Sequence, residues 1–180
     1  MSSVIARVSV VGAVSSGKST LAGEIARRLA APHIELDLLR YRPGWIPVSS
    51  EEFCHSVAVE VGRDRWVLDG NYAEVLDLIW IRAQLVVWLD FPLQIVLWRL
   101  FRRTADRLLN SRRVSIGKRE KLGRLLGSNS IFVWAVRSHQ ERRTQFERFL
   151  KTPRYGHLKV VRLRSPSEVE AWLSLVNGNF

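Results

Sequence analysis

Short runs of apolar residues alternate with longer amphipathic stretches along the chain. The apolar runs predict five strands, at residues 4–11, 32–37, 65–69, 85–90 and 157–163. The spacing of apolar residues between and after them predicts helices at 19–30, 49–61 (with Ser49 as N-cap), 73–80, 92–109 and 131–150, and a last helix that Ser167 and Glu170 begin as a capping box. Prolines and Gly44 predict a loop at 41–47. Strands that alternate with helices predict the α/β class, here a three-layer α/β/α sandwich around a five-stranded parallel sheet.

The composition is typical of one globular domain, which we expect to span residues 1–180. Of the 180 residues, 47% are hydrophobic and 25% are charged. The single cysteine, Cys54, excludes an internal disulfide, and the N-terminus enters the first strand without a signal-peptide pattern, so a cytoplasmic protein is expected. The most apolar stretch, 85–101, contains charged residues and is too short to span a bilayer, so no membrane partner is expected.

The positive charge is concentrated in one third of the chain. The net charge is +11, and residues 99–164 hold 19 of the 28 basic residues but only 4 of the 17 acidic ones. Such an excess favours a polyanionic partner, either the phosphates of a nucleotide or a nucleic-acid backbone. The alternative is that most of these residues form a solvated basic face on helices.

One motif combines strand, glycine-rich loop and helix in the order that phosphate binding requires. It has the pattern G-x-x-x-x-G-K-[ST], and its residues are Gly12, Ala13, Val14, Ser15, Ser16, Gly17, Lys18, Ser19 and Thr20. Gly12 and Gly17 allow a tight turn whose N–H groups form an anion-binding nest, and the helix that follows adds the positive end of its dipole. We expect Lys18 to reach the β- and γ-phosphates and Ser19 to ligate Mg²⁺, which makes ATP and Mg²⁺ the expected cofactors.

This loop and three later segments together resemble the adenylate-kinase-like P-loop kinases. The segments are Glu35-Leu36-Asp37, Val67-Leu68-Asp69-Gly70 and Trp88-Leu89-Asp90-Phe91-Pro92, the last before an arginine-bearing helix. More narrowly, the chain is similar to a bacterial subgroup labelled adenylate-kinase-like or "topology modulation protein". The resemblance implies a sheet in the order 2-3-1-4-5, an acceptor-binding insert at about 38–64 and a basic lid at about 103–137. It also implies in-line transfer of the γ-phosphoryl group of ATP to a small-molecule acceptor.

The resemblance also implies roles for individual residues. Asp69 would hold Mg²⁺ through water together with Ser19; Asp90 is the alternative acid, unless it only caps the helix that follows. Asp37 would orient or deprotonate the acceptor, or serve only as a turn or capping carboxylate. The acceptor would contact Arg40, Gly70, Asn71, Tyr72 and Arg137. The alternative for Tyr72 is that it only packs against other residues. Lys18, Arg103 and Arg137 would neutralise the phosphates, and Arg99, Arg102, Arg142 and Arg143 lie on the same two helices.

The chain departs from adenylate kinases at one point that bears on the acceptor. Asn71-Tyr72 follow the Asp-Gly pair, where adenylate kinases have a proline and a phosphate-binding arginine, so adenylate kinase activity is not expected. The four histidines show no ligand spacing with Cys54, and no zinc site is expected. We expect a monomer or a homodimer.

Two other functions stay open at the level of the sequence. One is a protein directed at nucleic acid or polynucleotide ends through residues 99–164; against it, Trp98 and Trp134 are expected in the core, where they could not stack on bases. The other is a regulatory ATP-binding module with little turnover.

Overall fold

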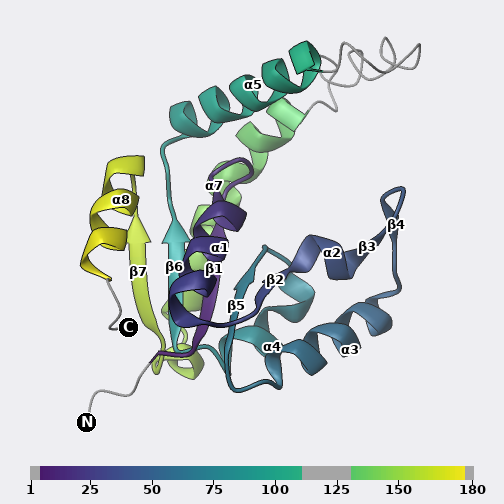
Figure 1. Cartoon of the computed structure of the whole chain (residues 1–180), viewed down its shortest axis with the longest axis vertical. Helices are drawn as coiled ribbons and strands as arrows, with labels where there is room; N and C mark the ends of the chain where they lie inside the picture. Colours follow the sequence, from purple (N-terminus) through teal and green to yellow (C-terminus); the bar gives the residue numbers. More distant parts are fainter. Residues whose placement is uncertain (1–4, 111–130, 177–180) are drawn as a thin grey trace.

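A five-stranded parallel sheet forms the centre of the protein (Figure 1). The structure, a computed structural model, describes residues 5–110 and 131–176, except for the side chains of 107–110 and 131–135. The strands of the sheet are β1 (Arg7–Gly12), β2 (His33–Glu35), β5 (Trp66–Asp69), β6 (Leu85–Leu89) and β7 (Lys159–Leu163), in the order β2-β5-β1-β6-β7. Counted without the two short strands of a separate hairpin, this is the order 2-3-1-4-5 that the resemblance implied.

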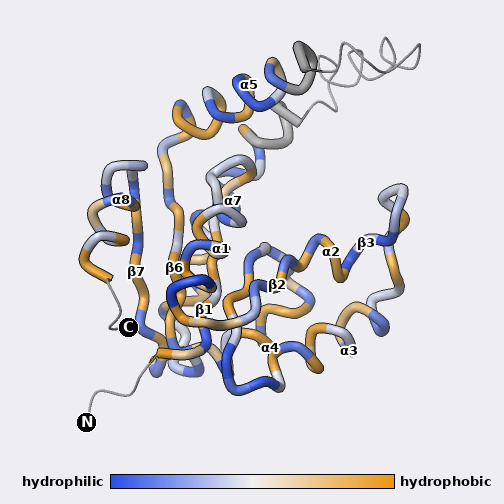
Figure 2. The backbone as a smooth tube through the Cα atoms, in the orientation of Figure 1, coloured by the Kyte–Doolittle hydropathy of each residue, from blue (hydrophilic) through white to orange (hydrophobic). Residues whose placement is uncertain are grey.

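Helices cover both faces of this sheet, so the α/β fold with a five-stranded parallel sheet is confirmed. The helices are α1 (Lys18–Leu29), α2 (Leu36–Arg40), α3 (Ser50–Val61), α4 (Leu76–Trp80), α5 (Leu93–Asn110), α7 (Ile131–Leu150) and α8 (Pro166–Leu175), with single 3-10 turns η1 (Ala73–Val75) and η2 (Pro153–Tyr155). Alternate residues of β6 divide between two apolar clusters: Val86 and Trp88 pack with α3, α4 and α7, and Val87 and Leu89 pack with α1 and α8. Because both of its faces are covered, β6 is apolar throughout, as Figure 2 shows.

Three local expectations were wrong. The second strand ends at Glu35 rather than Asp37, and Asp37 lies in the first turn of α2. Residues 41–47, expected as a loop, form a hairpin of β3 (Tyr41–Arg42) and β4 (Ile46–Pro47). The cap of α8 is Ser165, whose hydroxyl accepts from the N–H of Glu168, because Pro166 suits the first turn of a helix. By contrast, Ser49 caps α3 as predicted.

The two helices that border the predicted lid contact each other: α5 lies beyond the sheet, and α7 runs from α5 back along one face of the sheet (Figure 1). The chain between α5 and α7, which holds most of the predicted lid, lies outside the described residues. Within the described ranges, no helix has the length and apolar content that crossing a membrane requires.

Gly70 provides a test of the packing that positions the site. Its φ is 142°, and a Cβ added there would lie 2.7 Å from the Leu36 Cβ atom. We therefore expect Gly70→Ala to lower the free energy of unfolding by about 2–4 kcal/mol, through steric overlap and backbone strain. Chemical denaturation measures this change.

Gly23→Ala is the matched control. A Cβ on Gly23, inside α1, would meet nothing closer than the His33 Nδ1 atom at 3.7 Å. Because alanine has a higher helix propensity than glycine, the free energy of unfolding of this variant should be higher by about 0.5–1 kcal/mol. An equal loss of unfolding free energy in Gly70→Ala and Gly23→Ala would contradict the close packing inferred at Gly70.

Candidate functional site

The predicted phosphate-binding loop, residues 12–20 (the P-loop), connects β1 to the start of α1. Gly12 has a φ of 154°, and a Cβ there would lie 2.7 Å from the Leu89 carbonyl oxygen, so only glycine fits. Gly17 is the N-cap of α1 with a φ of 94°, and among the described residues no side chain caps this helix. The first N–H groups of α1 are therefore left for an outside acceptor, where the helix dipole adds positive potential.

Two hydroxyl groups inside the P-loop also lack a partner. The Oγ atoms of Ser15 and Ser16 are buried and have no hydrogen-bond partner among the described residues. Ser15 has a φ of 56°, which is uncommon for a residue with a side chain. Since buried polar groups are normally satisfied, these atoms suit a polar ligand. The P-loop therefore fits the phosphate groups of a nucleotide.

Lys18 lies folded back over the P-loop. Its Nζ atom donates to the carbonyl oxygens of Gly12 at 3.1 Å and Ala13 at 2.9 Å. The Gly12 carbonyl also accepts from the Asn71 amide, whose Oδ1 atom in turn accepts from the Gly12 N–H at 3.3 Å. Asn71 would therefore keep this carbonyl satisfied if Lys18 turned toward a phosphate.

The charges around Lys18 show which groups meet at the site. Burial lowers the pKa of Lys18 from its ordinary 10.5 to about 8. The nearby carboxylates of Asp69 and Asp37 act in the opposite direction, and the positive charges of Arg142 and Arg103 lower the pKa further. Four charged side chains from β5, α2, α7 and α5 thus lie within electrostatic range of one P-loop lysine.

Asp69 has the surroundings expected of an acid that serves Mg²⁺. It is buried at the end of β5, where its Oδ2 atom accepts from the Ser19 hydroxyl at 2.6 Å. Its Oδ1 atom lies 2.9 Å from the His33 Nε2 atom, a contact that sequence reasoning missed. A hydroxyl and a carboxylate side by side suit Mg²⁺, which takes few protein oxygens and completes its shell with water and phosphate oxygens.

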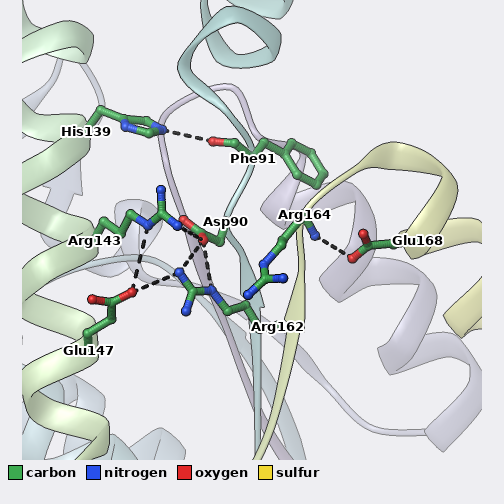
Figure 3. A network of polar contacts seen from close by, with 8 residues as sticks. All are labelled: Asp90, Phe91, His139, Arg143, Glu147, Arg162, Arg164 and Glu168. Carbon is green, nitrogen blue, oxygen red and sulfur yellow. Dashed lines mark hydrogen bonds and ion pairs between the residues drawn. The ribbon is translucent and has the colours of Figure 1, made fainter.

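Asp90, the alternative acid, is engaged elsewhere. Its Oδ2 atom lies 2.6 Å from the Arg162 Nη2 atom and 3.5 Å from the Arg143 Nη2 atom (Figure 3). Arg162 also binds Glu147 at 2.9 Å. In the same view the His139 ring lies 2.9 Å from the Phe91 carbonyl oxygen. These contacts fasten α7 to β6 and β7, so Asp90 stabilises the position of α7.

Asp37 is exposed and is held by a tyrosine. The Tyr72 hydroxyl donates to the Asp37 Oδ1 atom at 2.6 Å. Burial, and then the Asp37 carboxylate, raise the pKa of Tyr72 well above its usual value, so Tyr72 remains a donor. Arg142 is close to Tyr72 as well: burial lowers the pKa of Arg142, and Tyr72 partly opposes this. Arg142 therefore lies near both Lys18 and the Asp37–Tyr72 pair.

Two residues expected at the acceptor have structural partners instead. Arg40 donates to the Val48 carbonyl oxygen at 3.0 Å, pairs with Glu74 at 3.6 Å and lies over the Phe53 ring. Gly70 packs against Leu36.

The arginines of α5 and α7 divide by helix face. Arg99 donates to the Ser16 carbonyl oxygen at 2.6 Å and lies over the Phe91 ring, in contact with the P-loop. Arg103 and Arg137 are both exposed, but Arg103 is among the groups that act on Lys18. Arg142 was considered from the sequence only as a neighbour of Arg137. Its helical spacing from His139 and Phe146, which face the sheet, is the signal that could have singled it out.

Comparison with known proteins identifies the fold. Neither a protein-family model nor a curated protein matches the chain. Among solved structures, shikimate kinase from Acinetobacter baumannii in complex with shikimate has a TM-score of 0.57 and 15% identity, over 96% of this chain and 90% of that chain. Shikimate kinase from Bacteroides thetaiotaomicron has a TM-score of 0.55 and 14% identity, over 96% of each chain. A gluconokinase from Sinorhizobium meliloti 1021 has a TM-score of 0.51 and 18% identity, over 96% of this chain and 93% of that chain.

The chain therefore shares the fold of these kinases. At these identities the likeness shows the fold alone, and the narrower adenylate-kinase-like subgroup stays a prediction.

Replacing Lys18 tests the electrostatics of the P-loop. Because the pKa of Lys18 is lower in the folded protein, the charged amine opposes folding at pH values below about 8. This cost should decline as the pH rises from about 8 to 10.5, where the folded protein has lost a proton that the unfolded chain keeps. We expect Lys18→Met to raise the melting temperature of the nucleotide-free protein by a few degrees at pH 7, and the gain to shrink above pH 8.

Thermal unfolding across this pH range, with and without ATP-Mg²⁺, measures both the gain and the loss of ligand binding. The variant should lose the stabilisation that ATP gives the wild type. Lys151→Met, at an exposed lysine, is the control and should show neither effect. A lower melting temperature for Lys18→Met at pH 7 would contradict this account.

Proposed function

We propose that the protein is a P-loop kinase that transfers the γ-phosphoryl group of ATP to a hydroxyl group of a small molecule. One observation carries the proposal: the exposed Asp37 carboxylate lies within electrostatic range of the half-buried Lys18 of the P-loop. A candidate proton acceptor and a candidate phosphate ligand are therefore close together. The solved structures that share the fold are named as kinases of shikimate and gluconate, which supports a small-molecule acceptor.

In this proposal Asp37 takes the proton of the acceptor hydroxyl. The acceptor oxygen then forms a bond to the γ-phosphorus while the bond from that phosphorus to the bridging oxygen breaks, and ADP leaves. Tyr72 holds the Asp37 Oδ1 atom, which leaves Oδ2 for the acceptor. Fixing the base in this way reduces the reorganisation that the reaction requires.

The positive groups meet the charge of the phosphates. Lys18 turns from the Gly12 carbonyl oxygen to the β- and γ-phosphates, and Arg103 and Arg142 approach from the two lid helices. Arg137 is exposed on α7. The contact with the acceptor that the sequence suggested for it stays a prediction. Mg²⁺, held by Ser19 and Asp69 with phosphate oxygens, supplies further neutralising charge when bound.

Asp37→Asn tests the role of the base. The asparagine keeps the size and the contact with Tyr72 but cannot take a proton, so kcat should fall by about 10²- to 10⁴-fold with little change in ATP affinity. ADP release is measured with ATP-Mg²⁺ and a panel of nucleosides, nucleoside monophosphates, sugars and sugar acids. Binding of ATP without turnover on any acceptor would favour a regulatory ATP-binding module instead.

The chain offers a matched control in a second tyrosine–aspartate pair. The Tyr155 hydroxyl donates to Asp77, which also pairs with Arg154 at 2.8 Å, on the side of the fold formed by α4 and η2. Asp77→Asn makes the same change in this second pair, outside the P-loop, and should leave kcat unchanged. A similar fall in kcat in the two variants would mean that Asp37 contributes to folding and not to the reaction.

One observation favours the second candidate function, binding of nucleic acid. Trp98, expected in the core, is 63% exposed, and its ring stacks on that of Phe101, 56% exposed, with ring centroids 6.1 Å apart. The expectation failed because Val96 and Leu100 form the buried face of the amphipathic helix α5, whose alternating hydropathy Figure 2 shows. Arg102, exposed and one turn from Trp98, shares the stacked face. An aromatic platform beside arginine is typical of single-strand binding.

Titration of a single-stranded oligonucleotide at increasing salt tests this second function. We expect the logarithm of the affinity to fall linearly with that of the salt concentration, by about 0.7 per phosphate contacted. Trp98→Ala should weaken binding at every salt concentration, whereas Arg102→Ala should also reduce the slope. Trp45→Ala, at an exposed tryptophan of the acceptor insert, is the control. Absence of binding at low salt would exclude this function.

A further inference from the structure

The hairpin of the acceptor insert presents a tryptophan in a costly backbone conformation. Trp45 has a φ of 62° and is 73% exposed. Its N–H donates to the Arg42 carbonyl oxygen at 3.1 Å, and Gly44 before it has a φ of 87°, so a tight turn fixes this geometry. Exposure of a large apolar ring and a left-handed conformation are both unfavourable. Such strain commonly persists where it serves binding.

Aromatic rings continue from Trp45 to the proposed base. The rings of Trp45 and Tyr41 have centroids 5.2 Å apart. Tyr41 is near enough to Tyr72 to add to the rise in its pKa, and Tyr72 donates to Asp37. Trp45, Tyr41 and Tyr72, which we call the aromatic strip, thus lead from the hairpin turn to the Asp37 carboxylate. Leu38, beside Asp37, is 72% exposed and adds apolar surface next to it.

The arginines of the same insert already have partners. Arg42 donates from Nη2 to both carboxylate oxygens of Glu52, at 2.8 and 2.9 Å. Arg40 is held by the Val48 carbonyl oxygen and by Glu74. The insert therefore contributes aromatic rings to the surface near Asp37, and the cation near Tyr72, Arg142, comes from α7. That surface suits a neutral, flat ligand better than a phosphate or a carboxylate.

We propose that the acceptor is an uncharged compound with a planar ring and a hydroxyl group, whose ring lies on the aromatic strip while its hydroxyl meets Asp37. This substrate class rests on the proposed kinase function. Nucleosides and hydroxymethyl-substituted aromatic rings belong to it, whereas sugar acids and nucleoside monophosphates do not. The ring faces of Trp45 and Tyr41 provide apolar contact, and the carboxylate fixes the orientation of the hydroxyl.

Steady-state kinetics with adenosine, uridine, pyridoxine, shikimate, gluconate and AMP as probes tests the class. We expect ADP release with at least one of the first three probes and not with the anionic three. Trp45→Ala should raise the KM for that probe by about 5- to 100-fold while kcat and the KM for ATP change little. Trp45→Phe, which keeps a flat ring, should restore most of the affinity. Leu175→Ala, at an exposed apolar residue of α8, is the control and should leave all constants unchanged.

A binding measurement separates failure of this inference from failure of the kinase function. Saturation-transfer NMR with adenosine, uridine and pyridoxine reports ring binding without any turnover. If a ring probe binds, Trp45→Ala abolishes that binding and no ADP is released, the result would support ligand binding by the aromatic strip and overturn the kinase function. ADP release that prefers gluconate, shikimate or AMP, or a KM that Trp45→Ala does not change, would leave the kinase function standing and overturn the substrate class. So would the failure of all three ring probes to bind.

Discussion

Burial of one positive charge organises the site. Lys18 begins α1 with its amine enclosed over the P-loop, where it meets the positive end of the helix dipole and the charges of Arg103 and Arg142. Burial lowers the pKa of Lys18 to about 8, and two carboxylates, Asp69 and Asp37, oppose this change only in part. An anion between these groups would relieve the imbalance. The P-loop is thus arranged for a ligand with several negative charges, and the surrounding elements supply groups that face it.

A second set of charges fixes the frame. Asp90 and Glu147 bind Arg162 and Arg143, and these contacts tie α7 to the ends of β6 and β7 (Figure 3). Arg142 is the neighbour of Arg143 on the same helix, so its place near Lys18 follows from this attachment. The same carboxylate that could have served Mg²⁺ therefore has a mechanical role. Asp69, one strand beyond β1, is left to face Ser19.

The sequence predicted what depends on contiguous residues. The P-loop, the five strands and the Ser49 cap each follow from a local pattern, because turn geometry and strand burial are set by neighbours in the chain. The contacts of Tyr72 with Asp37, of His33 with Asp69 and of Asn71 with Gly12 join segments far apart in the sequence. Trp98 was placed in the core because its hydrophobicity was clear and the orientation of its helix was not. Only packing decides which face of an amphipathic helix turns inward.

The distribution of cations separates the two ligands of the proposed reaction. On the P-loop side, Arg103 and Arg142 lie within electrostatic range of Lys18, so this side suits the polyphosphate. On the insert side, Arg42 is paired with Glu52 and Arg40 with Glu74, and the exposed surface is aromatic. An anionic acceptor would meet no comparable excess of positive charge there. In the proposed reaction the insert would therefore select its ligand by shape and apolar contact. The two sides would meet at Asp37, which is exposed and lies within electrostatic range of Lys18.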